Sequence, residues 1–278
     1  MPATTDWTAA PSASPMRLAS WPERLERFQS VGSTNDVVMG WLRDGVPEVC
    51  IAIAEEQTAG RGRQGRTWTA PAGAALLLSL GFRPAWLPPE HVWRLGAVVA
   101  LAMATAAEDV AELPEGTIRL KWPNDLVVGP RKLAGLLGET DGIGTDDPKA
   151  VIGIGVNVDW PRPMFPSELA ATMTSLSELA GGRSVGRDAL EAAFLAALEI
   201  GIAKLRAARF DGAMWQDRQL TNGLPVRLDW PDGSSETVTA VNVDPGSGAL
   251  LVRSIEGSGP LRPVLAGEIR HLRLDGAA

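Results

Sequence analysis

A single cysteine occurs among the 278 residues, so no disulfide can form within one chain. Proteins without disulfides are typical of reducing compartments, and we therefore expect a cytoplasmic protein. Cys50 lies inside an apolar run, residues 49–54, where a small buried side chain of the core is expected. A disulfide-rich secreted domain is excluded.

Long apolar segments and an excess of positive charge are missing as well. No segment has 18 consecutive apolar residues, which excludes a membrane-spanning helix. The formal net charge is −7, whereas binding of duplex DNA depends on a basic face that neutralises phosphates. Residues 1–20 are rich in Ala, Pro, Ser and Thr, and they are expected to form a disordered leader, because no apolar stretch follows a basic start. We therefore expect no membrane segment and no DNA partner.

The residues that are present predict an ordinary globular core. The hydrophobic fraction is 45%, and the length allows one large domain with a small second one. Apolar runs between turn residues predict strands at 28–31, 49–54, 74–80, 118–122, 126–128, 133–137 and 151–158. Apolar residues at helical spacing predict helices after residue 34, over 88–110 and over 190–209. Short strands at 225–229, 236–243, 249–254 and 267–274, separated by Pro, Gly and Ser, predict a small β-barrel.

The most informative segment is an Arg/Gly loop, residues 60–68, which follows the apolar run 49–54. Three arginines alternate there with three glycines: Arg61, Arg63 and Arg66 with Gly60, Gly62 and Gly65. Glycines allow a ligand to come close and leave backbone N–H groups open to an anion, while arginines supply planar charged donors that suit carboxylate or phosphate. Such clustered charge is unfavourable unless an anion compensates it. The loop is therefore predicted to bind a polyanionic ligand.

Two other interpretations of the loop exist. The spacing Gly60-x-Gly62-x-x-Gly65 matches a dinucleotide-binding fingerprint, but that fingerprint needs a following helix and an acidic residue about 20 positions on. Residues 67–71 contain a proline and open no helix, and the next acidic residue is Glu90, so we exclude a Rossmann site. A solvated basic surface loop remains an alternative when the loop is considered alone.

Three further sets of residues are candidates. Ser33 and Thr34 precede an apolar helix, so they could cap it or bind a neutral polar group of a ligand. Lys121 lies at the end of a predicted strand, where catalytic groups are often held rigidly, although a solvated lysine fits the same position. Gly153 and Gly155 alternate within a predicted strand and leave one face without side chains, which indicates close approach of a ligand or of backbone.

Taken together, five ordered motifs resemble the biotin protein ligase family. They are Gly32-Ser33-Thr34-Asn35, Gln57-x-x-Gly60-Arg61-Gly62-Arg63-x-Gly65-Arg66-x-Trp68, Lys121-Trp122-Pro123-Asn124-Asp125, Lys132-Leu133-Ala134-Gly135-Leu136-Leu137-x-Glu139 and Gly153-x-Gly155-x-Asn157. The resemblance extends from about residue 28 to the end of the chain. Five motifs in the family's order favour ligand binding over a solvated loop and over helix capping.

The resemblance implies an ATP-dependent ligase that activates biotin as biotinyl-5'-AMP. It would transfer the biotinyl group to a lysine of a biotin carboxyl carrier protein, such as an acetyl-CoA carboxylase subunit, with biotin, ATP and Mg²⁺ as its ligands and with the metal ligands unknown. The catalytic residues implied are Lys121, Arg63 and Arg61. Biotin would be bound by Ser33, Thr34, Asn35, Gln57, Gly60, Arg61, Gly62, Arg63, Lys121, Gly153 and Gly155. The nucleotide would be bound by Arg63, Arg66, Trp68, Lys121 and Asn157.

The resemblance also implies an α+β fold. A mixed-sheet catalytic domain similar to class II aminoacyl-tRNA synthetases would span residues 21–221 and follow the leader, 1–20. A small SH3-like β-barrel would span residues 222–278. Too few residues precede residue 28 for the DNA-binding domain that some family members carry, so a monofunctional ligase is expected. A monomer and a homodimer are both compatible with the sequence.

Two alternative functions compete with the biotin ligase. A lipoate or octanoate ligase or transferase would share the fold, but it is not expected to combine the Arg/Gly loop with the Lys-Trp-Pro-Asn-Asp turn. A non-catalytic biotin-binding regulator would need no charge to stabilise an adenylate, whereas Arg61, Arg63 and Lys121 are all present. The sequence therefore favours the biotin ligase.

Overall fold

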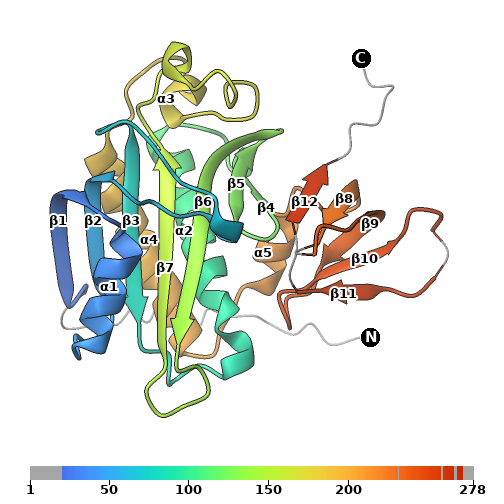
Figure 1. Cartoon of the computed structure of the whole chain (residues 1–278), viewed down its shortest axis with the longest axis horizontal. Helices are drawn as coiled ribbons and strands as arrows, with labels where there is room; N and C mark the ends of the chain where they lie inside the picture. Colours follow the sequence, from blue (N-terminus) through green and yellow to red (C-terminus); the bar gives the residue numbers. More distant parts are fainter. Residues whose placement is uncertain (1–20, 231, 258, 266–267, 272–278) are drawn as a thin grey trace, which may run out of the picture.

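A seven-stranded mixed sheet forms the centre of the larger part of the chain (Figure 1). The computed structural model describes residues 21–230, 232–257, 259–265 and 268–271. The strand order is β1–β2–β3–β7–β6–β5–β4, and only the β1/β2 pair is parallel. The strands are β1 (Arg24–Val31), β2 (Cys50–Gln57), β3 (Ala75–Phe82), β4 (Arg119–Lys121), β5 (Asp125–Val128), β6 (Arg131–Asp141) and β7 (Lys149–Asn157).

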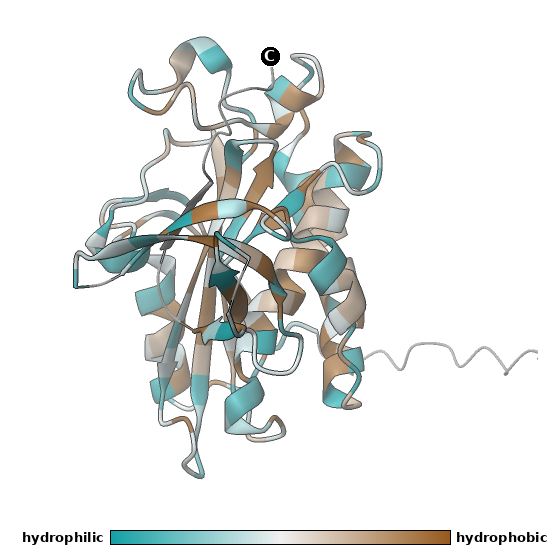
Figure 2. Cartoon of the chain, turned by 90° about the vertical axis from the view of Figure 1, so that its right-hand side faces the viewer, coloured by the Kyte–Doolittle hydropathy of each residue, from teal (hydrophilic) through white to brown (hydrophobic). Residues whose placement is uncertain are grey.

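Helices cover both faces of this sheet. Helix α1 (Thr34–Arg43) lies on one face, where Val38 and Leu42 pack in a small cluster with Cys50. Helices α2 (Trp93–Val110) and α4 (Arg187–Arg206) pack against each other on the opposite face and form the main core with the sheet. Because both faces are covered, β3 is buried along its whole length and is apolar almost throughout. Figure 2 shows that hydrophobic residues concentrate in the strands of this sheet.

A second, five-stranded antiparallel sheet follows the last helix. Its order is β11–β10–β9–β8–β12. The strands are β8 (Pro225–Asp229), β9 (Ser235–Val243), β10 (Leu250–Ser254), β11 (Arg262–Val264) and β12 (Glu268–His271). Helix α5 (Gly212–Asp217) precedes this sheet, and its buried Trp215 belongs to the core that both sheets share. Short helical segments complete the fold: η1 (Arg63–Gly65), η2 (Pro89–His91), η3 (Arg162–Met164) and α3 (Leu176–Leu179).

The predicted α+β class and the mixed sheet are confirmed, with local corrections. The predicted helix over residues 88–110 is divided into η2 and α2, so the helix proper begins at Trp93. Strand β1 begins at Arg24, four residues before the predicted start, and β11 was not predicted. Ser33 occupies the N-cap position of α1, but its side chain makes no capping hydrogen bond. The predicted leader, 1–20, and the end of the last predicted strand, 272–274, lie outside the described residues.

No helix in the described ranges is both long and apolar enough to cross a membrane.

A buried ion pair holds the edge strand β4 in place. The Arg218 guanidinium donates to the Glu108 carboxylate with Nη1 and Oε1 2.8 Å apart, and both side chains are almost fully buried. Glu108 also accepts from the backbone N–H of Ile118. The backbone of residues 218–220 then pairs with Leu120, which donates to the Arg218 carbonyl and accepts from Leu220 N–H. The three-residue strand is therefore paired on both edges.

We predict that Arg218→Met lowers the free energy of unfolding by about 3–5 kcal/mol, because it leaves the Glu108 carboxylate buried without its charged partner. Urea denaturation measures this loss. The matched control is Arg262→Met, which breaks the exposed Arg262–Glu236 pair and should cost no more than about 1 kcal/mol. Equal losses in the two variants would contradict the prediction.

Candidate functional site

A cavity of about 280 Å³ opens on the α1 face of the central sheet. It is bordered by the start of α1, by the end of β2, by the Arg/Gly loop and by the middle of β6 and β7. The lining residues are Ser33, Thr34, Asn35, Gln57, Arg61, Gly62, Arg63, Arg66, Thr67, Trp68, Asn124, Lys132, Gly135, Leu136, Leu137, Gly153, Ile154, Gly155 and Leu169. Gly153 lies against Asn35, whereas Gly155 and Gly135 lie against Trp68, which is next to Lys132. The cavity therefore has a neutral end near α1 and a cationic end near the start of β6.

The neutral end is a buried hydrogen-bond network at the start of α1. The backbone N–H of Thr34 donates to Gln57 Oε1 over 2.8 Å, and Thr34 Oγ1 lies 3.1 Å from the same oxygen. Beneath them, Ser79 Oγ lies 2.7 Å from Thr34 Oγ1 and 2.6 Å from Asn35 Oδ1. Ser79 is fully buried on β3. Polar groups with this degree of burial persist because they bond one another, so the network is held in a fixed arrangement.

The middle of the cavity is a slot made by glycines on neighbouring strands. Gly135 on β6 pairs directly with Gly155 on β7, and Gly153 lies two residues before Gly155 on the same face. The Trp68 indole occupies the space that their side chains would fill, since a Cβ at Gly155 would lie 2.5 Å from Trp68 Cε2 and one at Gly135 3.1 Å from Cζ3. A Cβ at Gly153 would collide with the Asn35 side chain. A ligand or backbone was expected to come close at Gly153 and Gly155; in the structure the groups that come close are the side chains of Asn35 and Trp68.

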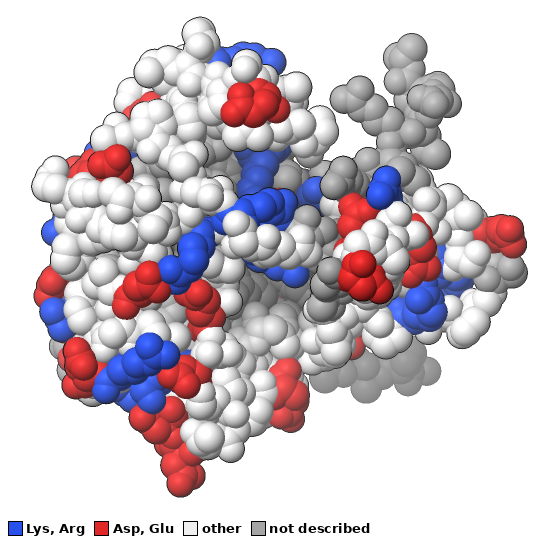
Figure 3. All heavy atoms as spheres, viewed as in Figure 1, with Lys and Arg blue, Asp and Glu red and all other residues white. Residues whose placement is uncertain are grey.

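Cations surround the other end of the cavity. Arg63 and Arg66 come from the loop, and Lys132 comes from the start of β6. Burial lowers the pKa of Arg63, and the charge of Arg66 lowers it further, so these two guanidinium groups repel each other. Lys132 Nζ lies 5.5 Å from the centre of the Trp68 ring and 2.7 Å from Asp125 Oδ1. Figure 3 shows Lys and Arg side chains in a band across the face that carries this loop.

Arg61 departs from the predicted pattern of mutually repelling arginines. Its guanidinium donates two 2.7 Å hydrogen bonds to the Asp36 carboxylate, and Nη2 donates to both oxygens of Glu139 over 3.1 Å. These carboxylates raise the pKa of Arg61, with the Asp36 hydrogen bond as the largest cause, and Arg61 lowers the pKa of Asp36 in return. The expected electrostatic need for an anionic ligand is therefore met within the chain at Arg61.

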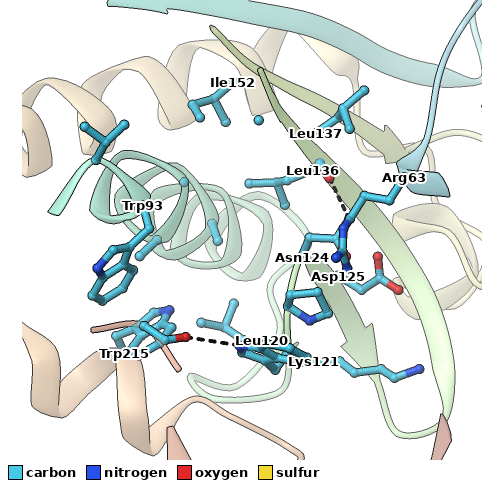
Figure 4. A pocket seen from close by; sticks show the side chains of 18 of the residues that line it. Arg63, Trp93, Leu120, Lys121, Asn124, Asp125, Leu136, Leu137, Ile152 and Trp215 are labelled. Atoms are coloured by element: carbon cyan, nitrogen blue, oxygen red, sulfur yellow. Dashed lines mark hydrogen bonds between the residues drawn. The ribbon is translucent and has the colours of Figure 1, made fainter. Parts of the chain in front are cut away.

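A second cavity of about 430 Å³ adjoins the first. The two share Arg63, Asn124, Leu136 and Leu137, so they meet across β6. Figure 4 shows an apolar wall with Trp93 and Trp215, while Lys121 extends away from that wall. The neighbouring Trp122 donates its indole N–H over 3.1 Å to the carbonyl of Gly248, in the turn between β9 and β10. This cavity therefore lies between the central sheet and loops of the second sheet.

The structure brings together eleven of the predicted site residues around the first cavity: Ser33, Thr34, Asn35, Gln57, Arg61, Gly62, Arg63, Arg66, Trp68, Gly153 and Gly155. Gly60 lines an open depression on the outer side of the loop instead. Lys121 lines the second cavity. Asn157 lines neither cavity, because its buried amide donates to the Thr174 carbonyl. Trp68, predicted for the nucleotide, lies beside the residues predicted for biotin.

Sequence reasoning assigned no role to four residues that shape the site. Ser79 belongs to an apolar run, and nothing in that run distinguishes a buried hydroxyl under α1 from a core position. Asp36 and Glu139 hold Arg61, although Asp36 lies in no motif. Lys132 was noted as part of a motif, and its adjacency to the glycines of β6 could have indicated a place in the same cavity. Within the described part of the chain, no three His, Cys, Asp or Glu side chains are grouped so as to hold a metal ion.

A comparison with protein families matches residues 27–157 to the biotin/lipoate A/B protein ligase family. Over 252 residues the chain is 33% identical to a Mycobacterium tuberculosis protein named biotin--[acetyl-CoA-carboxylase] ligase, covering 90% of each. It is also 33% identical over 244 residues to the Escherichia coli bifunctional ligase/repressor BirA, covering 86% of this chain and 71% of that protein.

Solved structures give the same result. The Aquifex aeolicus biotin protein ligase in complex with biotin and ATP superposes with a TM-score of 0.75 at 26% identity, covering 90% of this chain and all of that one. The Leishmania major enzyme in complex with biotinyl-5-AMP superposes with a TM-score of 0.62, also at 26% identity, covering 88% of this chain and all of that one.

The packing of Trp68 on Gly155 allows a prediction about stability. A methyl group at Gly155 would force the Trp68 ring away from β7, so Gly155→Ala should lower the free energy of unfolding by roughly 1–3 kcal/mol. Chemical denaturation measures the loss. Gly138→Ala on β6 is the control, because its Cβ would meet only Ile152 Cδ1 at 3.4 Å, which is ordinary contact. The prediction fails if both variants are equally stable.

Proposed function

Because the chain belongs to the biotin/lipoate A/B protein ligase family, we propose that its two cavities carry out both steps of carrier-protein biotinylation. The protein is an enzyme with the ligase activity of its relatives. In the first step biotin and ATP give biotinyl-5'-AMP and pyrophosphate. In the second step a lysine of a biotin carboxyl carrier protein takes the biotinyl group and AMP leaves.

One observation supports this proposal above the others: a single cavity joins a neutral hydrogen-bonding end, a middle section lined by glycines and by Trp68, and a cationic end. Biotin has the same three parts, a ureido ring, an apolar ring and chain, and a carboxylate. We propose that Thr34, Asn35 and Gln57 bind the ureido group. The glycines and Trp68 would enclose the apolar part, and the cations would meet the carboxylate.

The charge around the loop suits the first step. A biotin carboxylate oxygen must attack the α-phosphorus of ATP, which is already surrounded by negative charge, and the bond to the pyrophosphate oxygen then breaks. Cations placed at both reactants stabilise the charge that builds up in the transition state. We propose Arg63, Arg66 and Lys132 for this role, together with Arg61 and Lys121. No general base is needed in this step, because a carboxylate is already ionised near neutral pH.

Magnesium would neutralise the departing pyrophosphate. The described residues offer no carboxylate cluster for it, so we propose that the phosphates of ATP supply most of its ligands. The Asn157 side chain bonds to the Thr174 carbonyl. We propose that Asn157 contributes to nucleotide binding indirectly, by holding the segment around Thr174 near the adenine.

The finer architecture is part of the same proposal. We propose that residues 21–221 form the catalytic domain, similar to class II aminoacyl-tRNA synthetases, and that residues 222–278 form an SH3-like barrel. The antiparallel order of β8 to β12 supports the second assignment. The names of the relatives support an acetyl-CoA carboxylase carrier subunit as the partner. We place the reaction in the cytoplasm because the sequence allows no disulfide within one chain.

Lipoate is a poorer fit to the same cavity. Its dithiolane ring has no hydrogen-bonding groups, so it would displace water from Thr34, Asn35 and Gln57 without replacing the bonds to that water. Because these groups keep their partners within the network, each lost bond costs about 0.5–1.5 kcal/mol. A non-catalytic biotin-binding protein would explain the neutral end but not the cations gathered at the other end.

We predict that the protein releases pyrophosphate when it is incubated with biotin, ATP and Mg²⁺, and that lipoate in place of biotin gives little release. A coupled phosphate assay measures the rate, and chelation of magnesium should abolish it. Addition of a carrier domain should then yield a biotinylated lysine, which mass spectrometry detects. Pyrophosphate release with lipoate at an equal rate would favour the alternative ligase. Biotin binding without any release would favour the regulatory protein.

We predict that Lys132→Ala and Lys121→Ala each lower the rate of adenylation by more than they weaken biotin binding, because both charges act mainly in the transition state. Loss of one such donor costs about 10²–10³ in kcat. Single-turnover rates and equilibrium binding separate the two effects. Lys204→Ala, an exposed lysine on α4, serves as the control. If a variant loses biotin affinity and adenylation rate by the same factor, the lysine contributes to binding and not to stabilisation of the transition state.

A further inference from the structure

Glu139 contacts two residues that line the first cavity, Asn35 and Arg61, although none of the roles proposed above uses it. Its Oε2 accepts from Asn35 Nδ2 over 2.6 Å, and both of its oxygens accept from Arg61. Strand β6 places it two residues after Leu137, whose carbonyl also accepts from Asn35 Nδ2. The carboxylate therefore lies against a cation on one side and a neutral amide on the other.

The amide contact fixes which way Asn35 faces. An ionised carboxylate accepts hydrogen bonds and donates none. Asn35 must therefore turn its NH₂ group toward Glu139 and its Oδ1 toward the buried Ser79. An amide oxygen is only an acceptor, so the Ser79 hydroxyl has to donate its proton to Asn35 Oδ1.

The orientation of Asn35 also determines which hydrogen bonds the Thr34 hydroxyl can donate. Ser79 has one proton, and with that proton on Asn35 it cannot also donate to Thr34. The hydroxyl of Thr34 must then donate, either to Ser79 Oγ or to Gln57 Oε1, both of which lie within 3.1 Å. In both cases the lone pairs of Thr34 Oγ1 remain open toward the cavity that Thr34 lines. The cavity thus offers an acceptor to a ligand N–H.

We propose that Glu139 is a positioning residue for recognition of the ureido ring, acting through Asn35 and Ser79 to keep Thr34 Oγ1 an acceptor. The inference rests on the proposed binding of biotin at this site. In Glu139→Gln the new amide can donate to Asn35, which lets Asn35 turn over and donate to Ser79. Ser79 is then released to donate to Thr34, whose oxygen becomes a poorer acceptor for the ring N–H.

Asp36 provides a matched comparison. It shares Arg61 with Glu139 through two 2.7 Å hydrogen bonds, and none of the contacts of the Asn35–Ser79–Thr34 network involves it. An effect carried by the charge on Arg61 should appear in both acidic variants. An effect carried by the network should appear only when Glu139 is changed.

The experiment measures binding of biotin and of biotinol, the neutral alcohol of biotin, by titration calorimetry. Glu139→Gln should weaken both ligands by roughly tenfold, as expected for one hydrogen bond lost to a neutral ring. Asp36→Asn should change biotin binding only, with biotinol affinity within about twofold of the wild type. The ratio of the affinities for biotin and biotinol distinguishes an effect on recognition of the ring from an effect on recognition of the carboxylate.

A second variant keeps the test decisive if Glu139→Gln folds poorly. Ser79→Ala breaks the relay while leaving both acids in place, and it should weaken biotinol by a similar factor. On the Ser79→Ala background Glu139→Gln should add less than about twofold, because the path to Thr34 is already cut. Independent, multiplicative losses would show that Glu139 acts by another route.

These measurements distinguish failure of the inference about Glu139 from failure of the proposed function. Equal effects of the two acidic variants on biotin, with biotinol unchanged in both, would overturn the inference and assign Glu139 to Arg61 alone. Wild-type protein that binds neither biotin nor biotinol would instead overturn the proposed function. Wild-type binding with a biotinol loss confined to the Glu139 and Ser79 variants would support the inference.

Discussion

The packing of Trp68 against strands that lack side chains is the constraint on which the site depends. Gly135 and Gly155 are directly paired in the sheet, and the indole lies where their Cβ atoms would be. Because these positions carry no side chains, Trp68 of the Arg/Gly loop can pack directly on the sheet, and the loop forms one wall of the cavity. The same strands carry Leu136 and Ile154 on the opposite face, where they are buried in the main core. One pair of strands thus supplies the core on one side and the ligand slot on the other, through the alternation of side chains along each strand.

Charge around the loop is distributed more unevenly than the sequence suggests. Arg61 is neutralised within the chain by Asp36 and Glu139, whereas Arg63 is part-buried with a lowered pKa beside Arg66. The repulsion between Arg63 and Arg66 lies at the end of the cavity where Lys132 also lies, and Asp125, which pairs with Lys132, offsets part of it. A ligand that brings negative charge relieves the repulsion there most strongly. In the proposed reaction an adenylate would add a phosphate to what biotin alone brings, so this distribution would favour retention of the intermediate over retention of free biotin.

The sequence predicted most of the fold and the chemical character of the site, but not the contacts that couple its parts. Strands such as β2 and β3 were found because apolar runs between turn residues are local signals. Ser79 could not be found, since its role depends on the register that places it under Asn35. The partners of Arg61 come from α1 and β6, far apart in the chain, and no spacing rule links them. The alternating Gly153 and Gly155 predicted that some group packs closely on β7, but only the structure identifies this group as the side chains of Asn35 and Trp68.

The position of Lys121 depends on parts of the chain well beyond its own motif. A strand of three residues has little stability by itself, and β4 gains its second partner from residues 218–220, which the buried Glu108–Arg218 pair holds in place. The next residue, Trp122, donates to Gly248, which lies in the turn between β9 and β10. A displacement of this turn would therefore act on the residue next to Lys121. Because Gly248 and Leu265, both from loops of the second sheet, line the second cavity, a carrier protein that contacts these loops would act close to the proposed catalytic lysine.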